Sequence, residues 1–255
     1  MRPAQMFART ANPFSHRLAR LALLLACAGG LVVASAGPLS RFGGLEPYVV
    51  ISVFRYGSYM VFAAIALGLA TIVPTRPGDR RRGFLSALSA ITIGVVAAWM
   101  PVSFFLRANS LPRINDISTD TSNPPAFVVT LQLRRGAATP AAYEGERVAR
   151  LQHEGYPDIA PILLRVPPDE AFRRVDKVAM TLGWDVVARA PQEGRLEAVA
   201  ISDWFGFRDD IVVRIRPEDG GSRVDIRSKS RVGQSDLGVN AERVRAFLAG
   251  LRAQN

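Results

Sequence analysis

The stretch that decides the fold is Trp204–Asn240, which reads WFGFRDDIVVRIRPEDGGSRVDIRSKSRVGQSDLGVN. Residues 210–216 and 223–231 both alternate apolar positions with other side chains, which is the period of a half-buried strand. The Asp219-Gly220 pair between them tolerates positive φ and therefore favours a tight hairpin turn. A turn centred there predicts three cross-strand pairs, namely Ile215 with Val224, Val213 with Ile226, and Arg214 with Asp225. A slip of one residue would break all three pairs, so the register is well specified.

The positive charge of the chain is concentrated in its first half. Before Arg107 there are ten basic and two acidic residues, whereas the remainder holds 22 basic and 20 acidic residues. Most of the net charge of +10 therefore belongs to a segment in which loop arginines set membrane topology. A pI near 10.8 would otherwise suggest nucleic-acid binding, but the nearly neutral second half excludes nucleic acid as a partner.

Few residues are available for metal or nucleophile chemistry. The one cysteine is Cys27, which lies in an apolar run, and the two histidines are His16 and His153. An intramolecular disulfide is therefore impossible, and Cys/His zinc sites and Cys–His dyads are nearly excluded. No Walker, G-x-S-x-G or G-x-G-x-x-G motif follows a predicted strand. We expect neither a cofactor nor a bound metal.

Three apolar segments, about residues 18–36, 56–73 and 84–106, are each long enough to cross a bilayer. Arginines are frequent before the first segment and between the second and third, but scarce between the first and second. The positive-inside rule then predicts a cytoplasmic N-terminus and an outward-facing C-terminal domain. We therefore predict a membrane domain at residues 1–106 and a periplasmic domain at residues 107–255, in the inner (plasma) membrane of a bacterium.

The first apolar segment has a second interpretation. Ala34-Ser35-Ala36 has the A-x-A form of a signal-peptidase site, and cleavage after Ala36 would leave two spans. We prefer retention as a membrane helix, and the topology of the later spans is the same in both cases. Arg55 lies beside the second segment, where we expect it to reach the outer headgroups rather than line a polar pathway.

The C-terminal half alternates strand and helix patterns. Besides the hairpin, we expect strands at residues 127–133, 162–166, 184–189 and 195–202, and helices at 141–153, from Pro168 to Gly183, and after Asn240 as N-cap. Residues 113–127 favour turns, and their alternating Asp and Ser residues match a calcium loop only in part. This order predicts an α+β fold, a two-layer domain with an antiparallel sheet and helices packed on one face.

Four motifs carry a resemblance to a known family. They are INDISTDTSNPP (residues 114–125), YPDIAP (156–161), FGFRDDIVVRIRP (205–217) and SRVGQSDLGVN (230–240). Together they resemble the DUF1499 family, a bacterial group with plant relatives whose function is not established. The resemblance covers about residues 107–252, and it implies a domain displayed after a few hydrophobic spans. The family assigns no catalytic residue, so none is implied here.

A dense polar constellation is the first candidate site. Its members are Arg208, Asp209, Asp210, Arg231, Ser235, Asp236 and Asn240, with Asp116 and Asp120 as further candidates. An enzyme would use two carboxylates as acid and base beside Arg231 as an anion clamp. However, Asp209 and Asp210 are adjacent on a strand and must point to opposite faces. We therefore favour a structural or binding role, in which Asp236 pairs with Arg231 or accepts loop amides.

The cationic face of the hairpin is the second candidate site. Arg214, Arg216, Arg223, Arg227 and Lys229 could contact anionic lipid headgroups or an acidic envelope polymer. The alternative is an ordinary solvated strand face. We expect a non-catalytic binding or scaffolding module whose partners are the lipid bilayer and, in addition, envelope proteins, anionic headgroups or envelope polymers. A hydrolase-like enzyme that uses the Asp/Arg/Ser constellation is the other hypothesis.

Overall fold

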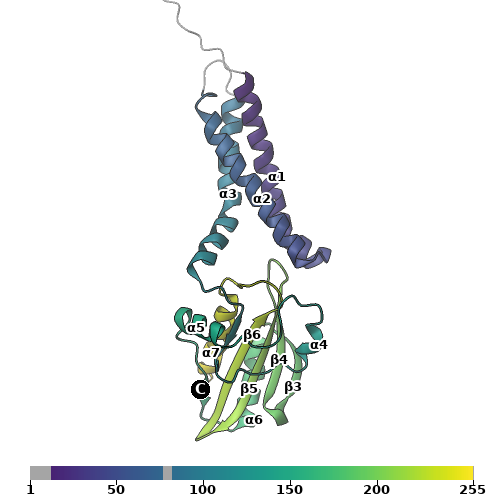
Figure 1. Ribbon diagram of the computed structural model, residues 1–255, viewed down its shortest axis with the longest axis vertical. Helices are drawn as coiled ribbons and strands as arrows, with labels where there is room; N and C mark the ends of the chain where they lie inside the picture. The colour runs from purple at the N-terminus through teal and green to yellow at the C-terminus, as the bar shows by residue number, and fades with distance from the viewer. Residues whose placement is uncertain (1–12, 77–81, 255) are drawn as a thin grey trace, which may run out of the picture. The chain divides into compact units, whose positions relative to one another are not determined.

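The computed structural model describes residues 13–76 and 82–254 (Figure 1). The chain divides into two compact units, Met1–Ser103 and Phe104–Asn255, which we describe separately. The boundary between the units falls near the end of helix α3 (Arg82–Ser110).

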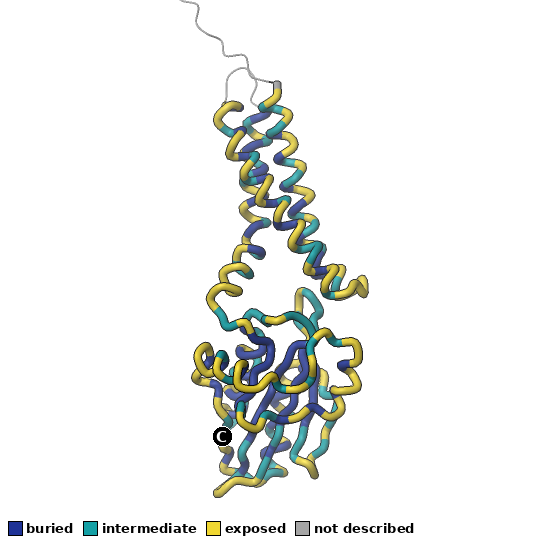
Figure 2. The backbone as a smooth tube through the Cα atoms, in the orientation of Figure 1, coloured by how far each residue is buried: buried dark blue, intermediate teal, exposed yellow. Residues whose placement is uncertain are grey.

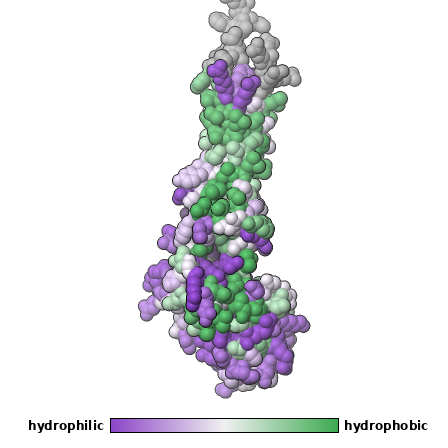
Figure 3. Space-filling model, turned by 90° about the vertical axis from the view of Figure 1, so that its right-hand side faces the viewer, coloured by the Kyte–Doolittle hydropathy of each residue, from purple (hydrophilic) through white to green (hydrophobic). Residues whose placement is uncertain are grey.

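The N-terminal unit is helical, as predicted. Within the described residues, three helices are long and apolar enough to cross a membrane, and they cover Phe14–Gly43, Pro47–Ile72 and Gly83–Ser110. They belong to α1 (Pro13–Gly43), α2 (Pro47–Ile72) and α3. Many of their outward side chains are both exposed and hydrophobic (Figures 2 and 3), which is the pattern expected for contact with lipid.

The second helix is longer than its apolar segment indicates. It begins at Pro47 rather than near residue 56, so Arg55 lies inside it. Proline is favoured in the first turn of a helix, and an arginine side chain is long enough to leave an apolar helix face. The guanidinium of Arg55 lies over the ring of Tyr56, 5.3 Å from its centroid.

Small residues bring α2 and α3 into close contact. Gly68 and Gly94 are buried, and a Cβ atom added at either position would lie 2.8 Å from Ile91 Cγ1 or 2.6 Å from Ile65 Cγ1. Without a side chain at these positions, the two backbones can approach closely.

The C-terminal unit is built on an antiparallel sheet of six strands, counted over residues 104–254. The strands are β1 (Asp116–Ser118), β2 (Ile162–Leu164), β3 (Asp185–Ala190), β4 (Arg195–Ile201), β5 (Arg208–Glu218) and β6 (Gly221–Ser230). Their order is β1-β6-β5-β4-β3, and β2 pairs with the first half of β6. Figure 1 labels β3 to β6. The sheet is therefore organised around the β5–β6 hairpin.

The hairpin register is the predicted one. Ile215 pairs with Val224, Val213 with Ile226, and Arg214 with Asp225. Gly220 in the turn has a φ of 79°, a conformation that costs a glycine nothing.

Two helices cover one face of the sheet and complete the core. They are α6 (Pro168–Thr181) and α7 (Val239–Arg252). Val175 of α6 and Phe247 of α7 belong to the same buried hydrophobic core as Ile211 and Ile226 of the hairpin. Gly183, with a φ of 71°, follows the last turn of α6, as predicted. These layers confirm the predicted α+β fold class.

The predicted strand at residues 127–133 is wrong. This segment forms the short helix α4 (Thr130–Leu133), which lies on the sheet face opposite α6 and α7. Its β-branched residues favour a strand, but the backbone N–H groups of Val128, Val129 and Thr130 are bound by the carboxylate of Glu197. Donors held by a side chain are not available for a sheet ladder.

Three further boundaries differ from the prediction. Residues 113–127 contain β1 as well as turns, because β6 supplies the hydrogen-bonding partner for Asp116–Ser118. Helix α5 (Glu146–Gly155) begins after Gly145, whose φ of 75° excludes it from the helix interior. Helix α7 begins at Val239, so Asn240 is a buried residue of its first turn and not the N-cap.

Candidate functional site

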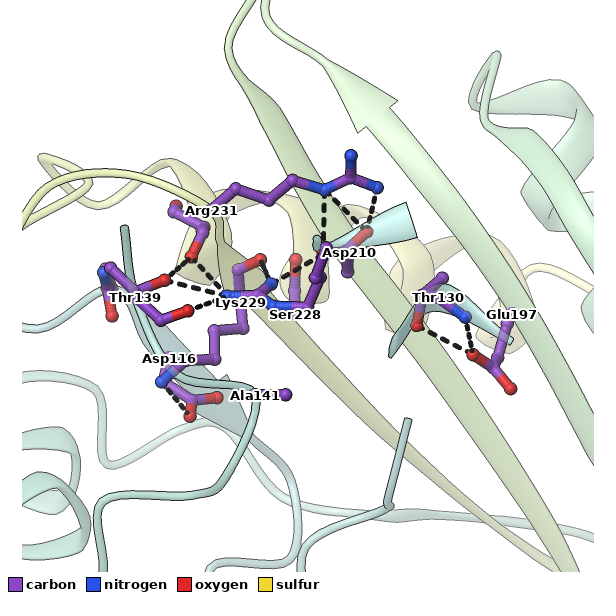
Figure 4. Close-up of polar contacts among 12 residues, drawn as sticks. Asp116, Thr130, Thr139, Ala141, Glu197, Asp210, Ser228, Lys229 and Arg231 are labelled. Atoms are coloured by element: carbon purple, nitrogen blue, oxygen red, sulfur yellow. Dashed lines mark hydrogen bonds and ion pairs between the residues drawn. The ribbon is translucent and has the colours of Figure 1, made fainter. Parts of the chain in front are cut away.

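Strand alternation gives the sheet a charged second face. The apolar side chains of β4, β5 and β6 point toward α6 and α7, so the residues between them point the other way. We define the polar face as nine of the charged residues on this second side, including Arg231 directly after β6. They are Glu197, Asp210, Arg214, Arg216, Arg223, Asp225, Arg227, Lys229 and Arg231. The segment from Thr119 to Glu144 supplies many partners of the polar face, and Figure 4 shows Thr130, Thr139 and Ala141 of this segment among the polar contacts.

Asp116 of β1 neutralises two cations of the polar face. Its carboxylate accepts hydrogen bonds from Arg227 Nε at 2.9 Å, Arg227 Nη2 at 2.8 Å and Lys229 Nζ at 3.0 Å. Arg227 also donates to the carbonyl of Ala141, and Lys229 pairs with Glu144 at 3.4 Å. The side chain of Lys229 is 0% exposed, so it cannot reach an external anion.

Two further carboxylates hold the three arginines nearer the hairpin turn. Asp225 accepts hydrogen bonds from Arg214 at 2.9 Å, Arg216 at 3.0 Å and Arg223 at 3.1 Å. Asp120 lies 3.1 Å from Arg214 and 3.3 Å from Arg223. Of the five predicted contacts for an anionic surface, two are therefore buried and the other three are shared between acids of the protein itself.

Asp210 of β5 is buried between two arginines. Its Oδ2 accepts a hydrogen bond from Arg134 Nη1 at 2.6 Å, and its Oδ1 accepts one from Arg231 Nη2 at 2.7 Å. Arg134 also donates to the carbonyl of Ser230, which ties the segment from Thr119 to Glu144 to the end of β6. The side chain of Arg208 is exposed, and its carbonyl accepts the N–H of Arg231 at 3.1 Å.

Glu197 of β4 is an important side chain that is not among the predicted candidates. Its buried carboxylate accepts the N–H groups of Val128, Val129 and Thr130 at 2.9–3.2 Å and the Thr130 hydroxyl at 2.8 Å, and it pairs with Arg195. Burial alone would raise the pKa of Glu197, but the hydrogen bonds from Thr130 and Val129 hold that pKa below its usual value. A lone acid inside an apolar strand is the signal that indicates such a role, because it must find partners.

Asp209 and Asn240 lie on the side of the sheet that α7 covers. Asp209 pairs with Arg243 of α7 at 2.8 Å, so it points away from Asp210, as strand alternation requires. The side-chain amide of Asn240 donates to Ser230 Oγ at 2.9 Å and to the carbonyl of Asn115 at 3.1 Å. These contacts tie the start of α7 to the ends of β1 and β6.

Asp236 caps α7, and it does not pair with Arg231. Its carboxylate accepts the N–H of Gly238 at 2.9 Å and the N–H of Asn240 at 2.7 Å. The predicted acceptance of loop amides is confirmed, whereas Arg231 pairs with Asp210 instead. Burial raises the pKa of Asp236 to about 6, although both amides favour the charged form. Next to Asp236, the hydroxyl oxygen of Ser235 accepts the N–H of Leu237 at 3.3 Å.

The predicted constellation is therefore several clusters rather than one. Asp116, Asp120 and Asp210 each pair with different cations on the polar face, whereas Asp209 and Asn240 lie behind the sheet. Among residues 13–76 and 82–254, no group of three or more His, Cys, Asp or Glu side chains could hold a metal ion. Each of these carboxylates is already paired with a cation of the protein itself, so this arrangement suits architecture better than acid–base chemistry.

Comparison with known families finds a match, and it lies within the C-terminal unit. The model of one family, described as a protein of unknown function (DUF1499), matches residues 116–251, which include every strand of the sheet and nearly all of α7. No curated protein matches the chain. The match confirms the resemblance carried by the four sequence motifs, and the chain belongs to the DUF1499 family.

Proposed function

We propose that this chain is a protein of the bacterial inner membrane whose C-terminal domain is a non-catalytic binding module on the outer side. Three helices long and apolar enough to cross a membrane support the anchoring. The excess of arginine before the first helix and between the second and third supports a cytoplasmic N-terminus.

The observation that carries the proposal is the contrast between the polar face and the surface over α4. The charged groups of the polar face are paired with internal partners and most of them are buried, while Arg216 and Arg223 remain 39% and 28% exposed. By contrast, four large apolar side chains gather on α4 and the two residues before it. They are Val128, Val129, Leu131 and Leu133, exposed by 48%, 36%, 46% and 46%, and we call them the α4 surface.

Exposed apolar groups of this kind mark interaction surfaces more often than isolated hydrophobic residues do. Figure 3 shows hydrophobic side chains gathered on the part of the C-terminal domain where α4 and β3 lie. The carboxylate of Glu197 fixes the backbone beneath this surface, so its side chains are presented without a large ordering cost. We infer that the partner is an envelope protein with a complementary apolar surface.

Site-specific photo-cross-linking in cells tests the proposed partner. A benzophenone amino acid at Leu131 should give a discrete adduct that a protease removes, whereas the same residue at Lys177, exposed on α6, should not. Leu133→Asp should abolish the adduct formed from position 131, because a charge in the contact would be desolvated. Adducts of equal yield at both positions, or none at position 131, would contradict the proposal.

Reporter fusions test the proposed topology separately. Alkaline phosphatase fused after Leu251 should be active, since the enzyme folds outside the cytoplasm, and a fusion after Asp79 should be inactive. The opposite pattern would place the domain in the cytoplasm and remove envelope proteins as partners.

A hydrolase-like enzyme is the second candidate, and the raised pKa of Asp236 is the observation that favours it. A serine nucleophile beside this acid would react with a fluorophosphonate probe. Labelling of the purified protein that Ser235→Ala abolishes would favour the enzyme over the binding module.

A further inference from the structure

The loop between β4 and β5 forms an aromatic cluster with the end of α3. The ring of Phe205 lies 6.0 Å from that of Phe104, centroid to centroid, and stacks on Phe207 at 5.1 Å. Phe104 belongs both to the C-terminal unit and to the candidate membrane span Gly83–Ser110. The loop thus contacts the end of a helix that is apolar enough to enter a bilayer.

The loop is held in one shape by hydrogen bonds between its own residues. Ser202 N donates to the carbonyl of Phe207 at 2.9 Å, and the Ser202 hydroxyl accepts the N–H of Phe207 at 2.9 Å. Gly206 donates to the carbonyl of Ser202 and has a φ of 67°, which closes the turn. The aromatic side chains are therefore presented by an ordered turn.

The outer side of this turn is apolar and exposed. Trp204 is 40% exposed, and Ile201 at the end of β4 is 46% exposed. Phe105 and Leu106, next to Phe104 on α3, are also exposed. We call Ile201 and Ser202–Phe207 the aromatic loop. Tryptophan and phenylalanine in such a position are typical of the boundary between lipid headgroups and acyl chains.

The position of Arg107 on α3 indicates how deep the Phe104–Phe205 contact would lie in a bilayer. Arg107 is the first charged residue after the apolar part of α3, so it must reach the headgroups or water. Phe104 lies three residues before it, which is about 4.5 Å along a helix and therefore closer to the acyl chains. A loop that touches Phe104 lies at the same depth. Asp203 in the loop limits this depth to the interface, because a carboxylate in the acyl region would be costly.

We propose that the aromatic loop is a second membrane attachment, in which Trp204 and Ile201 insert into the interface of the bilayer that α3 crosses. The partner is lipid, because the loop is continuous with a candidate membrane span through the Phe104–Phe205 contact. Arg208, exposed directly after the loop, is placed to contact lipid phosphates. This inference does not rest on the α4 surface or on the sidedness of the domain.

Quenching of tryptophan fluorescence by brominated lipid tests the attachment in the full-length protein. The chain has three tryptophans, and Trp99→Phe removes the one inside α3, leaving Trp184 and Trp204. Trp184 is buried and stacked on Phe247 in the core of the domain, so it serves as the unquenched reference. The matched control is Trp99→Phe/Trp204→Phe, and both proteins are placed in phosphatidylcholine bilayers with or without bromine near the top of the acyl chains.

The bromine should lower the emission of the Trp99→Phe protein and leave the double variant unchanged, while acrylamide in the water should quench Trp204 only weakly. Strong quenching by acrylamide without quenching by bromine would show that Trp204 is in water and would overturn the proposal. Protection from both quenchers would show that protein covers the loop, which would also overturn it. The emission of Trp184 in the double variant reports that the domain remains folded.

Discussion

The substitution Glu197→Ala tests whether one buried carboxylate creates α4. Glu197 accepts the backbone N–H groups of Val128, Val129 and Thr130, and α4 begins at Thr130. Without the carboxylate these donors lose their acceptor in a partly buried place. We therefore expect α4 to lose its structure while the sheet beneath it remains folded.

The magnitude follows from how deeply each donor is buried. The N–H and the hydroxyl of Thr130 are buried, and a buried donor without a partner costs about 1–3 kcal/mol. The N–H groups of Val128 and Val129 are part-buried, so water can replace much of their bonding. Removal of a buried charge offsets some of the loss. We expect the free energy of unfolding to fall by about 3 kcal/mol.

Urea unfolding of the full-length protein in detergent, followed by tryptophan fluorescence, measures this loss, and hydrogen exchange at residues 128–130 reports on α4. Glu193→Ala is the matched control, because Glu193 pairs with the same Arg195 at 2.8 Å but is largely exposed. Its removal should change stability by less than about 1 kcal/mol. If both variants unfold at the same urea concentration and the amides stay protected in both, the reasoning about Glu197 is refuted.

Three further predictions concern other contacts. Because burial raises the pKa of Asp236 to about 6, the folded state binds a proton more readily than the unfolded state, so this group's contribution to stability should fall as pH rises toward 6. Urea unfolding at several pH values should show that Asp236→Asn removes this dependence of stability on pH. An unchanged pH dependence in the variant would contradict the prediction. In double-mutant cycles Arg231→Ala should couple with Asp210→Ala by about 1–3 kcal/mol but be additive with Asp236→Ala within about 0.5 kcal/mol. Gly68→Leu should destabilise the N-terminal helices in detergent melts by about 1–3 kcal/mol, because even a Cβ atom would lie 2.8 Å from Ile91 Cγ1.

The hairpin could be predicted from the sequence because its information is local. The Asp219-Gly220 turn fixes the register, and the alternation of residues 210–216 and 223–231 assigns each side chain to a face. The same holds for α6, whose start at Pro168 and end before Gly183 are both marked by residue type. The apolar helices were predictable in number but not in length, since α2 continues beyond its apolar part.

The errors lie where a distant partner decides the local structure. The pairing of β1 with β6 joins segments about 110 residues apart in sequence, and nothing within residues 114–118 indicates it. Likewise the backbone N–H groups at the start of α4 are bound by Glu197, which is 67 residues away from Thr130. Residue preferences describe the segment alone, so they favour a strand where the tertiary contact produces a helix.

The balance of basic and acidic residues in the domain argues against the hairpin arginines as contacts for an external anion. Alternating arginines on a strand look the same whether the face is solvated or covered. A covered face differs from a solvated one because the covering segment must supply acidic residues. Without them, the arginines that surround the buried Asp225 would repel one another. The domain contains those acids, since its 22 basic and 20 acidic residues nearly cancel. Asp116 and Asp120, in the turn-rich segment before α4, supply them, so the near neutrality of the domain is itself a sign of internal pairing.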